Sequence, residues 1–209
     1  SSDVCSSDLQ IATDAIGSRL YIPDRGNKRI RLLNVPTNIV STIAGSGSVG
    51  TSNGIGAAAS FTDPVAVTLG SDDNLYILDQ IAAGVAKIRK LNLTTNEVTD
   101  FVSLNFTPSN YLVTDKGGDM YLTGGDTSGL RRITRDGLVI ILPNNEPLNS
   151  LAISPENGDV IIGSTYPAPS NSSFNNNIAG IARDEASALH QKQSKSIYAG
   201  VKLAVGIDG

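Results

Sequence analysis

The sequence predicts an all-β protein built from a repeated unit of four short antiparallel strands, and three observations support this prediction. First, 21 glycines and 9 prolines stand among short apolar runs in 209 residues, which indicates many turns joining many short strands. Second, a strand-like segment centred on positions 21, 76, 121 and 161 recurs at spacings of 55, 45 and 40 residues. Third, only residues 183–192 have a pattern compatible with a turn or two of helix.

Each unit begins with a short alternating run and continues, after a turn, into the recurring segment. The opening runs are residues 10–14, 66–69, 111–114 and 151–154, with a fifth at 202–205. The recurring segments are Leu20-Tyr21-Ile22-Pro23-Asp24, Leu75-Tyr76-Ile77-Leu78-Asp79, Met120-Tyr121-Leu122-Thr123 and Val160-Ile161-Ile162-Gly163. The intervening turns carry residues typical of hairpins, namely Gly17, Asp72-Asp73-Asn74, Gly117-Gly118-Asp119 and Asn157-Gly158.

Two further runs complete each unit. The third runs are basic and alternate with aliphatic residues, which predicts aliphatic side chains on one face and charges on the other; they are 29–33, 87–91, 130–134 and 178–183. The fourth runs are 40–44, 98–102, 138–142 and 197–199. Four strands in 40 to 45 residues is the length of a β-propeller blade. We therefore expect a β-propeller fragment of about four four-stranded antiparallel blades, at 10–45, 65–102, 111–142 and 150–200, with 201–209 starting a fifth.

The first unit resembles the NHL repeat of bacterial β-propellers. Residues 21–31, reading YIPDRGNKRIR, match its order of strand, acidic residue, Gly-Asn, basic residue and Arg-Ile-Arg, and the likeness continues through residues 42–47, the glycine-rich stretch to Gly56, and Pro64. The second unit has Ala83-Gly84 in place of Gly-Asn, and the third and fourth units are degenerate. The resemblance implies a six-bladed type of propeller and a non-catalytic binding scaffold whose ligand is a protein, a small molecule or a carbohydrate.

The repeated tyrosines and carboxylates indicate structural roles. We expect Tyr21, Tyr76 and Tyr121 to pack between neighbouring blades. Asp24 and Asp79, at the ends of their strands, are expected to accept hydrogen bonds from turn amides or from two basic residues of the adjacent strand, Arg29 and Lys87. Carboxylates at repeated positions indicate a structural role, so no catalytic residue is assigned.

Composition excludes some partners. The hydrophobic content of 40% suffices for a sizeable core, while a net charge of −4 disfavours nucleic acid and anionic membrane surfaces. No apolar run approaches the roughly 18 to 20 residues that a membrane-spanning helix needs. Residues 3–9, reading DVCSSDL, look like a translated sequencing-adapter tag from a metagenomic assembly, so residues 1–9 are taken as non-native.

Without the tag, which holds Cys5, no thiol remains, which is compatible with export. We therefore favour an extracellular or cell-envelope location. Residues 205–209 end within a strand-like segment, so we expect the sequence to be part of a larger multidomain chain.

Signals of chemistry are few. Residues 45–50 match the dinucleotide fingerprint G-x-G-x-x-G, but 51–56 favour a loop over a helix, so a flexible interblade loop is expected. His190 has no second histidine for a metal site. Calcium stays an open alternative to having no cofactor, because carboxylates are available, namely Asp24, Asp79, Asp115, Asp119 and Asp126. Three N-x-S/T patterns, at 92–94, 105–107 and 171–173, are attributed to chance.

The binding hypothesis rests on loops at one face of the disc. Arg25 and Asn27 in the first unit, and Tyr166 and Phe174 in the polar insertion 164–177, are the candidate binding residues. The rival hypothesis is a propeller enzyme, a lyase or a lactonase-like hydrolase, whose catalytic groups lie mostly in blades outside this sequence. A third hypothesis is a purely structural repeat.

Overall fold

The computed structural model describes residues 9–124, 129–142, 150–153, 160–163 and 178–181. In this part of the chain the secondary structure is β apart from one 3₁₀ turn, as predicted. The chain divides into two compact units, Ser1–Thr114 and Asp115–Gly209, and each is described by itself. The predicted helical turn at 183–192, the turn at 157–158, and the runs at 197–199 and 202–205 lie outside the described residues.

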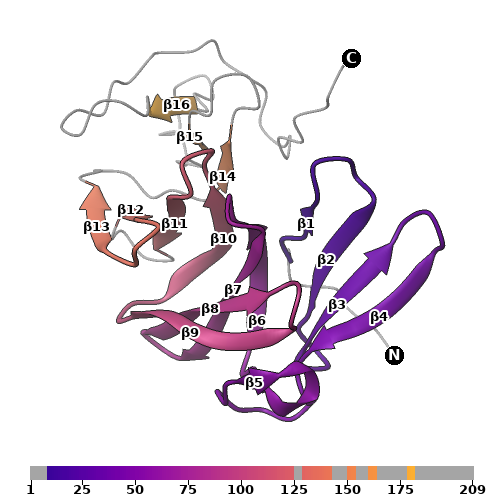
Figure 1. The fold of residues 1–209 in the computed structure, drawn as a ribbon. Helices are drawn as coiled ribbons and strands as arrows, with labels where there is room; N and C mark the ends of the chain where they lie inside the picture. The colour runs from indigo at the N-terminus through magenta and orange to yellow at the C-terminus, as the bar shows by residue number, and fades with distance from the viewer. Residues whose placement is uncertain (1–8, 125–128, 143–149, 154–159, 164–177, 182–209) are drawn as a thin grey trace, which may run out of the picture. The chain divides into compact units, whose positions relative to one another are not determined.

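The first sheet has four antiparallel strands in the order β1-β2-β3-β4 (Figure 1). Its strands are β1 (Ala12–Thr13), β2 (Arg19–Asp24), β3 (Arg29–Asn34) and β4 (Ile39–Ala44). Lys28 and Asn38, at the two later turns, have φ angles of 55°, which close these hairpins in the left-handed region.

The second sheet has the order β5-β9-β8-β7-β6 and therefore one strand more than a four-stranded blade. Its strands are β6 (Pro64–Leu69), β7 (Asn74–Ala82), β8 (Val85–Asn92), β9 (Glu97–Leu104) and the short β5 (Gly54–Ile55). The extra strand comes from the loop that joins the first two sheets, and the 3₁₀ turn η1 (Gly56–Ala58) follows it. The outer edge of the second sheet is thus covered by loop residues, which leaves fewer unpaired backbone groups.

Two more sheets follow. The third has the order β10-β11-β12-β13, with β10 (Pro108–Thr114), β11 (Met120–Gly124), β12 (Leu130–Ile133) and β13 (Val139–Leu142). The boundary between the two compact units falls between β10 and β11. The described strands of the fourth sheet are β14 (Ser150–Ile153), β15 (Val160–Gly163) and β16 (Ile178–Ile181), in that order.

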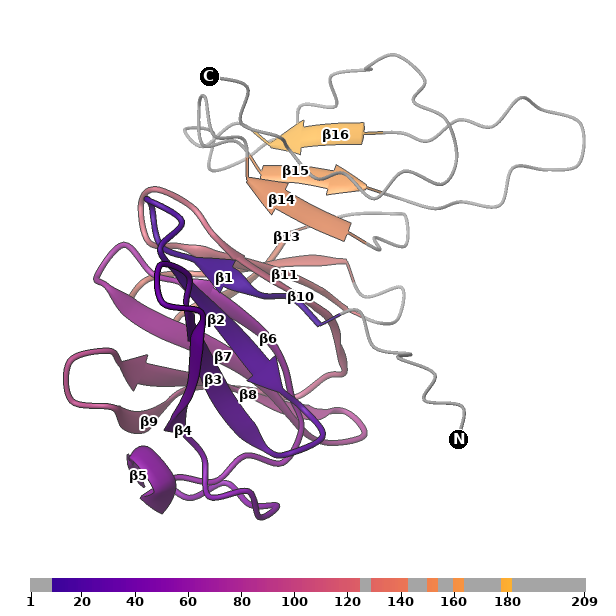
Figure 2. The same cartoon turned by 90° about the vertical axis from the view of Figure 1, so that its right-hand side faces the viewer.

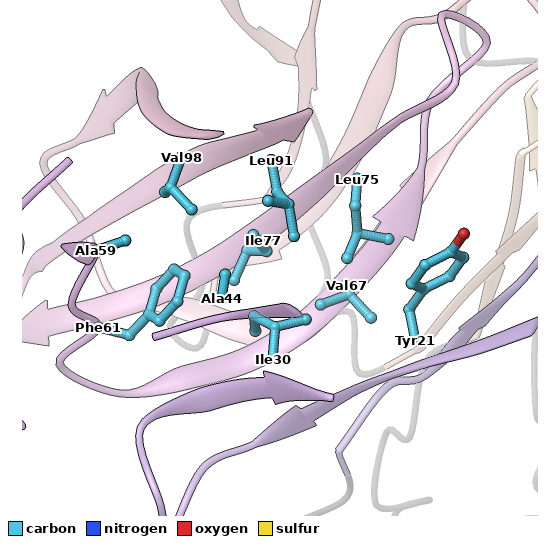
Figure 3. Close-up of a cluster of buried hydrophobic side chains, with 10 residues drawn as sticks. All are labelled: Tyr21, Ile30, Ala44, Ala59, Phe61, Val67, Leu75, Ile77, Leu91 and Val98. Atoms are coloured by element: carbon cyan, nitrogen blue, oxygen red, sulfur yellow. The ribbon is translucent and has the colours of Figure 1, made fainter. Parts of the chain in front are cut away.

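The core of the first unit lies between the first and second sheets. Tyr21, Ile30 and Ala44 of the first sheet meet Val67, Leu75, Ile77, Leu91 and Val98 of the second, with Ala59 and Phe61 contributed by the loop between them (Figure 3). All of these side chains are buried. The expectation that Tyr21 and Tyr76 are core residues is confirmed, and Tyr121 is also buried. Neither sheet covers its own apolar face, so each depends on the next copy.

The first strands of three successive sheets lie side by side in the first unit (Figure 2). Gln10 forms a parallel bridge to Ala66, and its side-chain amide pairs with the backbone of Leu112, with Nε2 donating to the carbonyl at 2.7 Å and Oε1 accepting from the amide at 2.7 Å. The Thr114 hydroxyl donates to Thr68 Oγ1 at 3.1 Å. Radial succession of antiparallel sheets with adjacent first strands is the arrangement of β-propeller blades.

Candidate functional site

The candidate site lies at one end of the first unit, where the turn between β2 and β3 meets the loop 45–63. Because neighbouring strands are antiparallel, the turn after the second strand and the connection after the fourth strand fall at the same end of a sheet. A depression of about 790 Å³ extends from this end over one face of the first sheet, and the residues that line it include Ile22, Asp24, Arg25, Lys28, Arg31, Val40 and Asp63.

A bidentate ion pair forms part of the rim of this depression. Arg25 donates to Asp63 through Nε at 2.7 Å and Nη2 at 2.6 Å, and Lys28 Nζ lies 3.5 Å from the same carboxylate. Burial favours the neutral form of Asp63, but Arg25 and Lys28 outweigh burial and hold the pKa of that carboxyl below its usual value. The Arg25 side chain keeps 36% of its surface exposed, so it is fixed in position and still open to solvent.

Of the four predicted binding residues, the structure describes two, Arg25 and Asn27. Arg25 and Asn27 both lie in the turn between β2 and β3, where Asn27 Nδ2 donates to the Asp24 carboxylate oxygens at 2.9 and 3.1 Å. Tyr166 and Phe174 lie outside the described residues, as does His190.

Asp79 binds the backbone just before β6, next to the ion pair at the rim. Its carboxylate accepts from the amides of Thr62 at 3.0 Å and Asp63 at 2.6 Å. Burial raises the pKa of Asp79 to about 6, although both amides and Arg89 favour the charged form. The carboxylate thereby fixes Asp63, the residue that in turn fixes Arg25.

The expected partners of the strand-end carboxylates are corrected in part. Asp79 does bind backbone amides, but they belong to the loop before β6 and not to its own hairpin. Lys87 pairs with Asp100 at 2.7 Å, and Arg29 donates to the Ser46 carbonyl at 3.3 Å. The loop amides have no strand partner of their own, so the nearest buried carboxylate is drawn to them.

Arg89 is the centre of the buried charge in the second sheet and is fully buried. Its Nη2 donates to the Ser52 carbonyl at 3.0 Å and to Asn53 Oδ1 at 2.8 Å, and Nη1 donates to the Ser60 carbonyl at 3.2 Å.

Its charge is also balanced. Arg89 Nε lies 2.7 Å from Asp100 Oδ1, an ion pair without hydrogen-bond alignment, and Nη1 lies 3.7 Å from Asp79. The guanidinium carbon stands 5.5 Å from the centre of the Phe61 ring, within cation–π range.

The prediction that the third strand separates aliphatic and charged faces holds for Arg29 to Leu32 of β3 and is wrong for β8. Lys87, Arg89 and Leu91 share one face of β8, and Ile88 and Lys90 share the other, so each face carries both kinds of side chain. Lys90 pairs with Asp72 at 2.8 Å and stands 5.7 Å from the centre of the Tyr76 ring. A charge on a strand face that packs against other parts of the protein needs a local partner.

The glycines of the fingerprint-like motif serve close packing. Gly45 has a φ of 102°, and a Cβ at this position would lie 2.5 Å from the Lys28 carbonyl oxygen. A Cβ at Gly50 would lie 2.5 Å from Ser60 Oγ. The helical structure that follows the motif within the loop 45–63 is a three-residue 3₁₀ turn, where a dinucleotide fingerprint opens an α-helix.

The loop 45–63 is tied down, in contrast to the flexible loop that the sequence suggested. Backbone hydrogen bonds join Gly45 to Gly56 at 3.0 Å, Ser46 to Ala59 at 2.8 Å and Gly50 to Phe61 at 3.2 Å. Together with the contacts of Asp79 and Arg89, these bonds make the loop a fixed part of the blade interface.

The carboxylates considered for calcium have hydrogen-bond partners within the protein where they are described. Asp115 accepts from the amides of Gly117 at 2.7 Å and Asp119 at 3.0 Å, and from the Tyr121 hydroxyl at 3.3 Å. Burial and the Asp115 charge raise the pKa of Tyr121 to about 12. Asp126 lies outside the described residues. In the described ranges, three or more His, Cys, Asp or Glu side chains nowhere gather in a metal-holding group. The same ranges contain no helix long and apolar enough to cross a membrane.

Comparison with known proteins supports the fold and leaves the family open. A family model described as "Domain of unknown function (DUF8202)" matches residues 158–209, about a quarter of the chain. A search of curated proteins gives no match.

Solved structures similar to this chain are β-propellers. Hydrazine synthase of Kuenenia stuttgartiensis is 14% identical over 84% of this chain and 47% of its own, with a TM-score of 0.59. A putative gluconolactonase is 11% identical over 82% of this chain and 59% of its own, with a TM-score of 0.57.

A nidogen/laminin complex structure is 14% identical over 75% of this chain and 55% of its own, with a TM-score of 0.57. The chain thus spans about half the length of these structures, and at such identities the likeness shows the all-β propeller fold.

Proposed function

We propose that this chain is a binding scaffold of the NHL-repeat propeller type, which presents ligand-contacting side chains on fixed loops at one end of the blades. Arg25 and Asn27 are the described contact residues, and Tyr166 and Phe174 extend the same role to the insertion 164–177. The ligand class is a protein, a small molecule or a carbohydrate. The proposed protein works outside the cell or in the envelope, within a larger chain, without a cofactor, without nucleic acid and without membrane insertion.

The observation that carries the proposal is how the charged groups are used. Asp79 fixes the amide of Asp63, and Asp63 fixes Arg25, whose side chain stays 36% exposed. Buried charges elsewhere in the first unit bind loop backbone in the same way, as Arg89 does with the carbonyls of Ser52 and Ser60. Charged side chains that hydrogen-bond loop backbone groups preorganise a surface for binding. This use favours a recognition role over acid–base catalysis.

The alternative is a propeller enzyme, a lyase or a lactonase-like hydrolase. The putative gluconolactonase among the similar structures favours testing this alternative. It requires catalytic groups from blades outside this sequence, since the described charges at the rim are paired with one another.

Binding is tested on arrays of immobilised glycans and peptides probed with the labelled chain. We expect saturable binding to a subset of spots, reduced at least about tenfold by Arg25→Ala, a loss of about 1.4 kcal/mol. Arg19→Ala is the matched control, because Arg19 is exposed at the opposite end of the same strand, β2. Thermal melting of both variants checks that the fold is kept.

Absence of binding on every array, or an equal effect of Arg25→Ala and Arg19→Ala, would count against the proposal. The enzyme alternative is tested in parallel by following hydrolysis of δ-gluconolactone with calcium added. Hydrolysis faster than the uncatalysed rate would favour the enzyme.

A further inference from the structure

The first two sheets carry the same face in the same register. Ile22 pairs with Arg31 across β2 and β3, as Ile77 pairs with Arg89 across β7 and β8. Leu33 pairs with Val40 across β3 and β4, and Leu91 pairs with Val98 in the equivalent place. The face of the first sheet that carries Ile22, Arg31 and Val40 is therefore a copy of the face that carries Ile77, Arg89 and Val98.

The two copies differ in what covers them. Ile77, Arg89 and Val98 are each 0% exposed, because the first sheet and the loop 45–63 lie on them. In the first sheet Val40 is 49% exposed, and Ile22 and Arg31 are partly exposed. These three residues line the depression described above.

Arg31 is also short of a charge partner on its own sheet. Arg89 stands opposite Asp100 on the next strand and forms an ion pair with it. Arg31 stands opposite Thr42 in the equivalent position and donates to its hydroxyl. A guanidinium in this position needs more acceptors before it is buried, and in the second sheet the loop 45–63 supplies them as two carbonyls and an amide oxygen.

We infer that the face formed by Ile22, Arg31 and Val40 is the seat of a preceding blade of the same polypeptide, and that Arg31 binds carbonyl oxygens of the loop joining that blade to β1. The interface between the first two sheets supplies the template for this contact, with Tyr21, Ile30 and Ala44 as the covering residues. The similar propeller structures are longer than this chain, by a factor of about 1.8 for the hydrazine synthase and about 1.4 for the putative gluconolactonase, which leaves room for such a blade.

This inference goes beyond the binding role. A preceding blade would cover the floor of the depression, so the floor would not contact ligand, while Arg25 and Asn27 would stay exposed at its rim. In the second sheet the corresponding turn, with Gly84, has its residues exposed or partly exposed even though the face below is covered.

The test is thiol labelling with a maleimide, read at the introduced cysteine by peptide mass spectrometry; in the 209-residue chain a Cys5→Ser background holds no other cysteine. Val40→Cys is compared in the 209-residue chain and in the complete polypeptide encoded by the gene. Ile16→Cys, at a residue 85% exposed in the turn before β2, is the accessible control, and Val98→Cys, at a residue 0% exposed, is the buried control.

We expect Val40→Cys to react about as fast as Ile16→Cys in the 209-residue chain. In the complete polypeptide its reaction should slow at least about tenfold, towards the rate of Val98→Cys, while Ile16→Cys is unchanged. Equal rates for Val40→Cys in both proteins overturn the inference. Protection within the 209-residue chain that grows with protein concentration, together with a dimer mass by light scattering, also overturns it, because the occupant is then a second copy. Neither outcome depends on the array binding of Arg25→Ala.

Discussion

Replacing Arg89 with methionine should strongly destabilise the first unit. The substitution keeps most of the side-chain volume and removes the charge and its hydrogen bonds, so the result reports on the polar contacts more than on a cavity. Arg89 has two loop carbonyls, an amide oxygen and two carboxylates as neighbours, and is fully buried.

The expected loss follows from the groups that are left behind. Asp79 is 0% exposed and would lose the cation that favours its charged form. Breaking a buried pair by removing one partner costs about 3 to 5 kcal/mol, and the lost loop contacts overlap with that figure because they share one side chain. A loss of about 4 kcal/mol is a large share of the roughly 5 to 15 kcal/mol that stabilises a typical domain.

Urea unfolding followed by tyrosine fluorescence and far-ultraviolet circular dichroism measures the loss. The sequence has six tyrosines and no tryptophan, so tyrosine is the intrinsic probe. Arg31→Met is the matched control, because Arg31 has the same place in the repeat but is partly exposed; its loss in the 209-residue chain should stay within about 1 kcal/mol. A loss below about 1 kcal/mol for Arg89→Met, or equal losses for the two variants, would refute this account of the buried charge.

Three further outcomes are expected. Gly45→Ala should destabilise by about 1 to 3 kcal/mol in urea unfolding, because its φ is 102° and its new Cβ would stand 2.5 Å from the Lys28 carbonyl oxygen; an unchanged midpoint contradicts this packing. Tyr76→Ala should cost about 3 to 5 kcal/mol, since Tyr76 is 5% exposed and its hydroxyl donates to Asp72 at 3.1 Å; a melting temperature equal to that of the wild type would contradict the placement of the tyrosine strand in the core. Burial raises the pKa of Asp79 from 3.8 to about 6, so the native state binds its proton more tightly than the unfolded state, and this group lowers the free energy of unfolding by up to about 3 kcal/mol as pH rises from 4 to 6. Because the lowered pKa values of Asp63 and Asp72 act in the opposite direction, the quantity to measure is the difference in free energy of unfolding between wild type and Asp79→Asn, and a difference that does not change with pH would refute the assignment.

Turn chemistry shows how much local structure the sequence already specified. Residues 34–38, reading NVPTN, and 92–96, reading NLTTN, occupy equivalent turns between third and fourth strands. Asn92 Oδ1 accepts from the amides of Thr94 and Thr95 at 2.9 Å each, and Asn96 has a φ of 57°. The N-x-T pattern at 92–94 therefore has a structural reason, and comparing the two turns in the sequence would have found it.

The buried charges show what local pattern misses. The alternation around Arg89 predicts a strand, and the structure has one there. Alternation alone does not show which face of the strand packs against a neighbouring sheet. Coverage is a property of the neighbouring blade and its loop, which approach from 29 to 37 residues away in the sequence. For the same reason the sequence indicated turn amides or Lys87 as the partners of Asp79, whereas the structure shows amides of the loop before β6.

By itself the sequence determined the all-β class, the four-stranded unit, the buried tyrosines and most strand positions, because these follow from alternation and turn residues acting over a few positions. Tertiary structure decided that the loop 45–63 is fixed, that Arg89 is buried and Arg31 is not, and that Arg25 is held by Asp63. Those outcomes depend on distant segments meeting in space, where a buried charge is stable only if acceptors from another blade reach it.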